Sequence, residues 1–213
     1  MDSASACRHA ADPSHAALAW GGMDSFPSPV IRSGRLDLRE FGADDLDLAS
    51  EVAAAGERAA LPPGVPVSRD ELAEWFANGM HLVGRGDAVH LMMLDRAAGR
   101  MVGAISLFHA DWEIRSAEIG YGVRSDARGQ GYATEALAAV ARWALTEGGI
   151  QRAWLTTNTD NAASARVAEK VGFRREGTLR RAGREDDGLH DLAIYSLLDD
   201  ELPELRAERS ARV

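Results

Sequence analysis

The stretch that decides the fold reads RSDARGQGYATEAL and runs from Arg124 to Leu137. It opens with polar residues and two glycines, Gly129 and Gly131, and continues into a sequence with helical spacing. Glycine costs roughly 1 kcal/mol relative to alanine inside a helix, so glycines directly before one need a reason. The first N–H groups of a helix lack internal partners and carry partial positive charge. The stretch therefore predicts an anion-binding loop, with a plain strand-to-helix turn as the alternative.

Arg128 lies inside this stretch and adds a guanidinium whose planar fork suits phosphate oxygens. A diphosphate is the anion that we expect there. The chain contains no G-x-x-x-x-G-K-[ST] pattern, which excludes a nucleotide-binding P-loop. Gly120 and Gly122 begin a dinucleotide-type glycine pattern, but Ser125 stands where its last glycine would be. That departure argues against a dinucleotide site.

Elements of regular structure are predicted on both sides of the loop. Apolar residues recur at helical spacing from Ala133 to Leu145, which predicts an amphipathic helix. Three apolar segments with short links precede the loop and predict an antiparallel meander at residues 89–94, 101–108 and 116–123. The pattern further predicts strands at 35–41, 153–157, 173–179 and 189–198 and helices at 44–55, 68–79 and 161–171.

This order predicts one α/β (α+β) domain with a mixed, mostly antiparallel sheet of about seven strands flanked by about four helices. We expect the domain to occupy residues 30–205. Residues 1–29 are rich in Ser, Ala, Gly and Pro and predict a flexible extension, with a short helix possible at 14–20. Residues 206–213 are expected to form a C-terminal tail.

The composition limits the class of protein. The chain has 213 residues, of which 27% are charged and 46% hydrophobic, as in ordinary globular domains. Its net charge of −9 argues against a nucleic-acid partner. One cysteine, no secretory h-region and no run of about 20 apolar residues predict a cytoplasmic protein without a membrane partner. The six histidines show no H-E-x-x-H spacing, so no metal is expected.

Three segments carry a resemblance to a known family. The pattern V-x4-R-x-x-G-x-A from Val123 to Ala133, after an AEIGYGV strand, resembles the acyl-CoA signature of the GNAT superfamily of N-acyltransferases. Residues 161–173 are similar to the N-x-x-S-x-x-V-x-E-K-x-G-F segment of its RimJ/RimL branch of ribosomal-protein N-acetyltransferases. Residues 187–198 are similar to the closing strand of that branch. The resemblance implies a single GNAT domain with a splayed sheet.

The resemblance also implies acetyl-CoA, or another acyl-CoA, as co-substrate. The pantetheine arm would pair with the exposed backbone of residues 121–123, and the pyrophosphate would lie on the amides of residues 128–133. Asn161 would hydrogen-bond the pantetheine, with Asn158 close by. The implied cofactor-binding residues are Tyr121, Gly122, Val123, Arg128, Gly129, Gln130, Gly131, Tyr132, Ala133, Thr134, Asn158, Asn161 and Ser164.

Acyl transfer needs a neutral amine, a stabilised oxyanion and a proton for the thiolate. The resemblance assigns the base to Glu118, near the centre of the AEIGYGV strand. Strand alternation puts Glu118, Gly120 and Gly122 on one face, which the glycines are expected to keep open. A solvated or salt-bridged strand glutamate is the alternative interpretation.

Two residues are candidates for the general acid. Ser164 matches the serine that this branch carries near the sulfur, although its hydroxyl is also placed to bond the backbone of its own helix. Tyr195 on the last strand has better acid chemistry, although strand tyrosines commonly serve packing. The oxyanion donor would be a backbone N–H, that of Tyr121 or of Val123.

The resemblance thus implies an N-acetyltransferase that acts on a primary amine by direct attack in a ternary complex. The acceptor is a protein N-terminus or a small-molecule amine. Alternatives are another donor such as succinyl-CoA, an antibiotic acceptor, and a CoA-binding sensor or scaffold without turnover. A monomer and a homodimer are both compatible with the sequence.

Three further features have a simpler interpretation. Five arginines between Arg174 and Arg184 are interpreted as a solvated hairpin face, with contact to the CoA 3′-phosphate as the alternative. His109 and His190 are read as ordinary histidines that could also line the acceptor cleft. In this family residues 61–67 would lie at the acceptor site and could act as a lid.

Overall fold

The computed structural model describes residues 24–78, 88–185 and 188–202. The helix expected at residues 14–20, the tail at 206–213 and most of the expected N-terminal extension lie outside these residues. Within the described part of the chain, no helix is long and apolar enough to cross a membrane.

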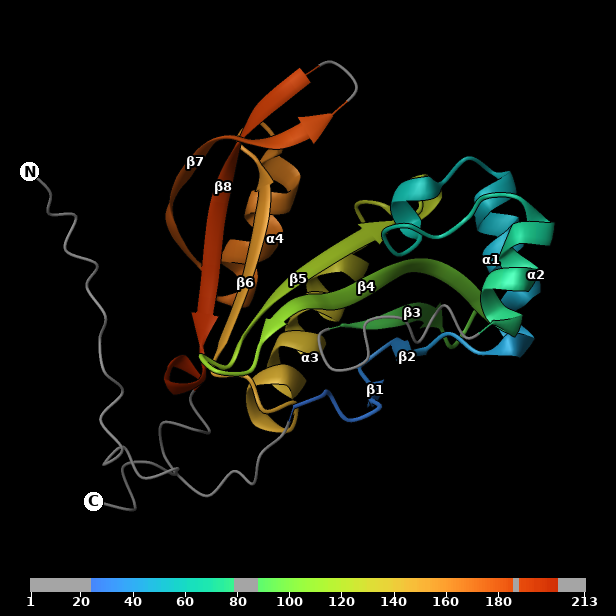
Figure 1. Ribbon diagram of the computed structural model, residues 1–213, viewed down its shortest axis with the longest axis horizontal. Coiled ribbons are helices and arrows are strands. Elements are labelled where there is room, and N and C mark those ends of the chain that lie inside the picture. Colours follow the sequence, from blue (N-terminus) through green and yellow to red (C-terminus); the bar gives the residue numbers. More distant parts are fainter. Residues whose placement is uncertain (1–23, 79–87, 186–187, 203–213) are drawn as a thin grey trace, which may run out of the picture.

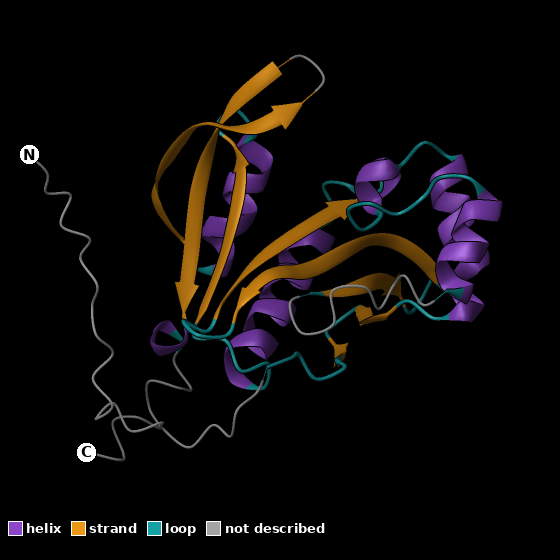
Figure 2. Ribbon diagram, in the orientation of Figure 1, coloured by secondary structure: helices purple, strands orange, loops and turns teal. Residues whose placement is uncertain are grey.

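A single sheet forms the body of the molecule (Figures 1 and 2). It has eight strands in the order β1-β2-β3-β4-β5-β6-β8-β7. The pair β5–β6 is parallel, and every other neighbouring pair is antiparallel. The strands are β1 (Val30–Arg32), β2 (Leu36–Glu40), β3 (Val89–Asp95), β4 (Arg100–Asp111), β5 (Ser116–Val123), β6 (Arg152–Asn158), β7 (Arg174–Glu185) and β8 (Gly188–Leu198).

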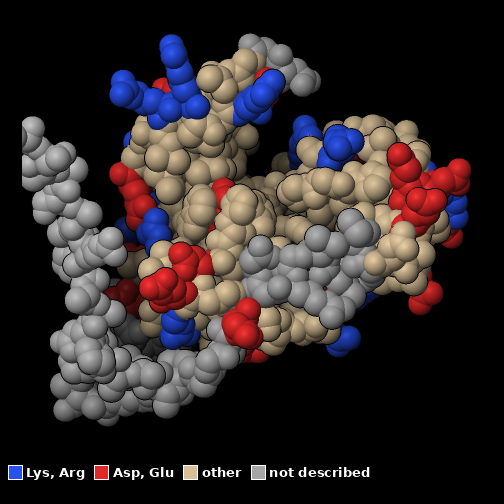
Figure 3. All heavy atoms as spheres, viewed as in Figure 1, with Lys and Arg blue, Asp and Glu red and all other residues tan. Residues whose placement is uncertain are grey.

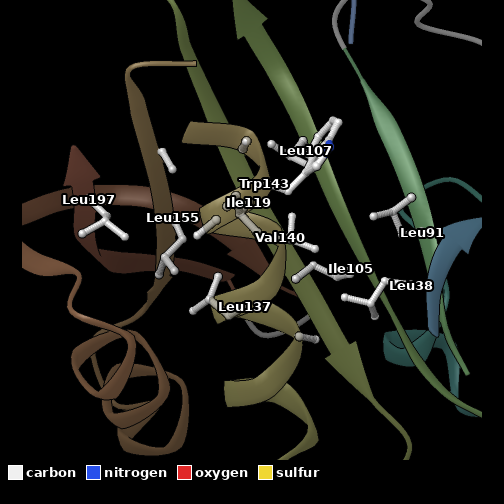
Figure 4. Close-up of a cluster of buried hydrophobic side chains, with 14 of the residues drawn as sticks. Leu38, Leu91, Ile105, Leu107, Ile119, Leu137, Val140, Trp143, Leu155 and Leu197 are labelled. Carbon is white, nitrogen blue, oxygen red and sulfur yellow. The ribbon is translucent and has the colours of Figure 1, made fainter. Parts of the chain in front are cut away.

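Helices cover both faces of this sheet. The apolar stripe of α3 packs on one face, where Leu137 and Val140 meet Ile105 and Ile119 in the main core (Figure 4). On the other face, α1 and α2 enclose a smaller core around Met92. Alternation along β3 and β4 supplies both cores from the same strands. The helices are α1 (Leu46–Ala54), α2 (Arg69–Ala77), α3 (Tyr132–Thr146) and α4 (Ala162–Val171).

The strands β5 and β6 separate after a short paired stretch. Only Ser116, Ala117 and Glu118 pair with β6, whereas β5 stays paired with β4 to its last residue, Val123. Figure 1 shows the two strands diverging from that point. Residues 119–123 therefore present a backbone edge that β6 does not cover, as the splayed sheet of the predicted fold requires.

The predicted fold class and meander are confirmed, with two differences in the strands. The structure has β1 in addition to the seven strands expected, and this strand is three largely exposed residues without an apolar pattern. The strand expected at 173–179 extends to Glu185 as β7. Its second half is exposed and polar, so no apolar alternation marked it.

Candidate active site

A cavity of about 660 Å³ lies between the uncovered edge of β5 and the N-terminal ends of α3 and α4. All the predicted cofactor-binding residues line it except Gln130 and Asn158. Figure 3 shows the molecule hollowed between the β7–β8 hairpin and the part that carries α1 and α2. We call this space the first cavity.

The loop before α3 forms one end of the first cavity. Gly129 and Gly131 have φ angles of +74° and +85°, a region that residues with a Cβ adopt at a cost. Gly131 is the N-cap of α3, so the amides of Tyr132, Ala133 and Thr134 belong to its first turn and have no partner within the helix. The glycines thus set the backbone conformation that leads into this first turn, whose three residues line the cavity.

Side chains hold the loop in place. The Nε2 of Gln130 donates to the backbone oxygen of Asp126 over 3.0 Å, so Gln130 closes the loop and does not line the cavity. The phenol of Tyr132 donates to the carboxylate of Asp95, and this hydrogen bond anchors the Tyr132 side chain at the end of β3. The guanidinium of Arg35 lies 4.4 Å from the centroid of the Tyr132 ring. The start of α3 is therefore tied to the ends of β2 and β3.

The first turn of α4 forms the opposite wall. The Oδ1 of Asn161 accepts a hydrogen bond of 3.0 Å from the amide of Ser164 and caps the helix. The hydroxyl of Ser164 lies 2.9 Å from the phenol oxygen of Tyr121. Burial raises the pKa of the Tyr121 phenol above its ordinary value, and the hydrogen bond with Ser164 partly opposes this shift. Two hydroxyl groups from different elements thus meet at the cavity wall.

The sequence reasoning missed the Tyr121 phenol and two cations of the first cavity. Arg166 and Lys170 line the cavity from one face of α4, together with Ala163 and Val167. Their i, i+3, i+4 and i+7 spacing was the signal that could have found them. For Tyr121 the signal was strand alternation, which turns it away from Glu118 and toward α3 and α4.

The arginines of β7 line neither of the two cavities described here. Almost every residue of that strand is exposed, and Figure 3 shows basic side chains on both sides of the hairpin. Arg174 pairs with Glu201 at 2.9 Å. A solvated hairpin face is the interpretation that this placement supports.

Glu118 is the last residue of β5 that pairs with β6. Its side chain is 12% exposed and lines neither cavity, although Tyr121 and Gly122 farther along β5 line both. Its Oε1 accepts a hydrogen bond of 3.0 Å from the hydroxyl of Thr156, and its Oε2 lies 3.0 Å from the Nδ1 of His109. The carboxylate is therefore fixed at the point where the two strands separate.

The glycines beside Glu118 line a cavity on that face, and both also allow close packing of neighbouring groups. A Cβ on Gly122 would lie 1.4 Å from the backbone oxygen of Ala59, and a Cβ on Gly120 would lie 2.8 Å from the Phe108 ring. The backbone around Ala59 and the ring of Phe108 fill the space that the missing side chains leave. Both glycines serve close packing.

A second cavity of about 350 Å³ lies on the Glu118 face of β5. Residues Leu61, Pro62 and Gly64 of the expected lid segment line it, as do Phe108 and Ser106. It shares Ala59, Tyr121 and Gly122 with the first cavity. The two cavities therefore meet at the uncovered edge of β5.

Two further predicted site residues, besides Gln130 and Glu118, line neither cavity. Tyr195 is 3% exposed within the main core and pairs with Leu155 of β6 and Arg175 of β7. Asn158 donates to the carboxylate of Glu185 and links β6 to β7. Of the two candidate acids, only Ser164 is brought to the first cavity.

Known proteins resemble this chain in sequence. The uncharacterized N-acetyltransferase YoaA of Bacillus subtilis (strain 168) is 30% identical over 103 residues, which are 48% of this chain and 58% of YoaA. The ribosomal-protein-serine acetyltransferase of Escherichia coli (strain K12) is 31% identical over 100 residues, which are 47% of this chain and 56% of that protein. In both matches the chain spans little more than half of the curated relative.

A solved structure resembles the fold over a longer range. RimL, a ribosomal L7/L12 alpha-N-protein acetyltransferase in complex with coenzyme A, superimposes with a TM-score of 0.70 at 24% identity. The superposition covers 82% of this chain and 100% of RimL. Residues 35–174, which include the loop before α3 and the whole of α4, match the family described as acetyltransferase (GNAT) domain. The chain belongs to the GNAT acetyltransferase family, as its motifs and its splayed sheet indicate.

Proposed function

We propose that the protein transfers the acetyl group of acetyl-CoA to a primary amine by direct attack in a ternary complex. The observation that carries this proposal is the meeting of the two cavities at Tyr121 and Gly122. A thioester held in the first cavity and an amine held in the second would reach the same point from opposite faces of β5.

The chemistry of the first cavity suits coenzyme A. The amides at the start of α3 and the guanidinium of Arg128 would hold the pyrophosphate. The uncovered backbone of residues 121–123 would pair with the amide groups of the pantetheine, beside Asn161. Arg166 and Lys170 of α4 add two cations to the lining of the first cavity, and these would bind the 3′-phosphate of coenzyme A. An acyl-CoA is the donor that this set of groups fits.

The transfer would use three groups on β5 and α4. Glu118 takes a proton from the ammonium, directly or through water, and the neutral amine attacks the thioester carbon. A backbone N–H of Tyr121 or Val123 stabilises the oxyanion while the N–C bond forms. The C–S bond then breaks, the Tyr121–Ser164 hydroxyl pair supplies a proton to the thiolate, and the surplus proton on the new amide nitrogen returns to that pair, so that the product is a neutral amide.

The second cavity favours an acceptor with a small group beside the amine. Its volume of about 350 Å³ and its lining by Leu61, Pro62 and Phe108 suit a short side chain, as at a protein N-terminus. Arg58 is the only charged residue among those that line it in the described chain, which argues against polycationic acceptors. The E. coli relative that carries ribosomal-protein-serine acetyltransferase as its name makes such N-termini the first acceptors to test.

The test measures free thiol after incubation with acetyl-CoA or succinyl-CoA. Each donor is offered with N-terminal peptides, single amino acids, polyamines and aminoglycosides. We expect release with acetyl-CoA and peptides that begin with small residues. Thiol release with succinyl-CoA but not with acetyl-CoA would show that the donor is succinyl-CoA. Thiol release with amino acids as the only productive acceptors would show that the acceptor is a small molecule. Tight CoA binding without release from any mixture would favour the sensor.

A further inference from the structure

An irregularity in β4 turns His109 toward Glu118. Phe108 lies directly opposite Glu118 in the β4–β5 register, and this register shifts between Phe108 and Asp111. Because side chains alternate along a strand, a regular β4 would place His109 on the opposite face from Glu118. His109 instead has a φ of +52°, and its Nδ1 lies 3.0 Å from the Oε2 of Glu118.

This local conformation is not explained by packing of the His109 side chain. That side chain is 72% exposed, so burial does not require the left-handed backbone. Bulges commonly redirect one side chain, and left-handed residues with a Cβ are uncommon outside turns and functional sites. The imidazole lies edge-on to the Phe108 ring, with 4.9 Å between the ring centroids, and its polar contact is the one with Glu118.

The pair connects an enclosed carboxylate with solvent. Glu118 is 12% exposed, and the hydroxyl of Thr156 occupies its other oxygen. A proton taken up by Glu118 between the strands needs a route out before the next turnover. The exposed imidazole of His109 provides one at hydrogen-bond distance.

We propose that His109 carries the proton from Glu118 to solvent, an inference that rests on the proposed function. The amine proton first reaches Glu118, which then passes it to the Nδ1 of neutral His109. The imidazolium loses the proton on Nε2 to water, so that the ring is again neutral and Glu118 is again a carboxylate. Exchange of ring protons with water restores Nδ1 as an acceptor. His109 acts through Glu118 and does not touch the amine.

Two substitutions separate this relay from simple positioning. His109→Asn keeps a hydrogen-bond donor toward Glu118, and asparagine tolerates a positive φ. Its amide, however, does not take up and release a proton. His109→Gly relieves the backbone and leaves space for added imidazole. We expect kcat to fall at least about tenfold in both, with the KM of acetyl-CoA and of the amine nearly unchanged. Added imidazole should restore kcat in His109→Gly only.

Thr156→Val is the matched control, because it removes the other hydrogen bond to Glu118 and leaves the relay intact. Imidazole should not raise its kcat. Equal kcat in wild type and His109→Asn, or no response of His109→Gly to imidazole, overturns the relay alone. A wild type that releases no thiol with any acceptor overturns the proposed function and the relay with it. If His109→Gly does not fold, kcat of His109→Asn decides.

Discussion

The phenol oxygen of Tyr121 lies 2.9 Å from the hydroxyl oxygen of Ser164, which joins β5 to the first turn of α4. Both residues line the first cavity. Burial raises the pKa of the phenol, so it stays protonated at neutral pH. A protonated pair at this wall is the proton source that we assign to the leaving thiolate.

Tyr121→Phe should therefore lower kcat by about 100-fold, because it removes one hydroxyl without opening a cavity. Ser164→Ala should lower it less, since the phenol remains. Steady-state kinetics and calorimetric titration with CoA separate turnover from binding. Tyr195→Phe is the matched control, and its kcat should equal that of wild type because Tyr195 lies in the core. The opposite ranking of Tyr121→Phe and Tyr195→Phe would contradict the assignment.

Glu118→Gln should lower kcat by about 100-fold or more while the dissociation constant of CoA stays within about twofold. Glutamine keeps the shape of the side chain and can still accept the hydrogen bond from Thr156, but it takes no proton. The exposed Glu74 of α2 offers the same substitution away from both cavities. Glu74→Gln should leave kcat unchanged. Full activity in Glu118→Gln would contradict the assignment of Glu118 as the general base.

Gly131→Ala should weaken CoA binding at least tenfold, because alanine is strained at a φ of +85° and shifts the amides that follow. Gly99 in the β3–β4 turn has a φ of +61° and lies outside both cavities. Gly99→Ala should cost a similar stability, about 1 kcal/mol, with normal CoA binding. Thermal unfolding measures the loss of stability, and calorimetric titration measures the affinity for CoA. Equal CoA affinities in the two variants would contradict the role of the loop.

Lys170→Ala should weaken binding of CoA about tenfold and binding of 3′-dephospho-CoA much less, since Lys170 is one of the cationic residues that line the first cavity. Arg180 on the exposed face of β7 is the matched control. Arg180→Ala should bind both compounds as wild type does. A loss of CoA affinity in Arg180→Ala but not in Lys170→Ala would indicate that the 3′-phosphate binds at the β7–β8 hairpin instead.

Glu176→Gln should destabilise the fold at neutral pH and not near pH 2. Arg152 binds both carboxylate oxygens and Ser196 donates to one of them, which lowers the pKa of Glu176 from 4.5 to about 2. A lowered folded-state pKa stabilises the protein above pH 4.5, and that stabilisation is lost as the pH falls toward 2. The side chain is 41% exposed, so we expect about 1 kcal/mol. Urea unfolding at several pH values measures the difference, and a constant difference would contradict the assignment.

Local sequence patterns were sufficient for most of the fold. The stripe of α3 and the loop before it were recognised because helical periodicity and glycine positions are properties of neighbouring residues. The short strand β1 and the outer half of β7 carry no such pattern, since few of their side chains enter the core. These two segments are strands because they pair with a neighbouring strand, and such pairing does not show in the pattern of adjacent residues.

The candidate site was predictable where a motif fixes the backbone. Gly131 and Asn161 lie on the first cavity as their motifs imply. The contact between His109 and Glu118 depends on a register shift, which the sequence of β4 alone does not reveal. The packing of Ala59 against Gly122 joins segments far apart in the chain. Long-range register and packing, rather than composition, determine these parts.

The central claim is that the first cavity holds the acyl-CoA and delivers its thioester to the meeting point of the two cavities. A crystal structure with bound CoA tests it most directly. The account predicts the pyrophosphate on the amides of residues 128–134, the pantetheine along residues 121–123 and the sulfur beside the Tyr121–Ser164 pair. CoA bound elsewhere, or a sulfur remote from Tyr121, would contradict the account.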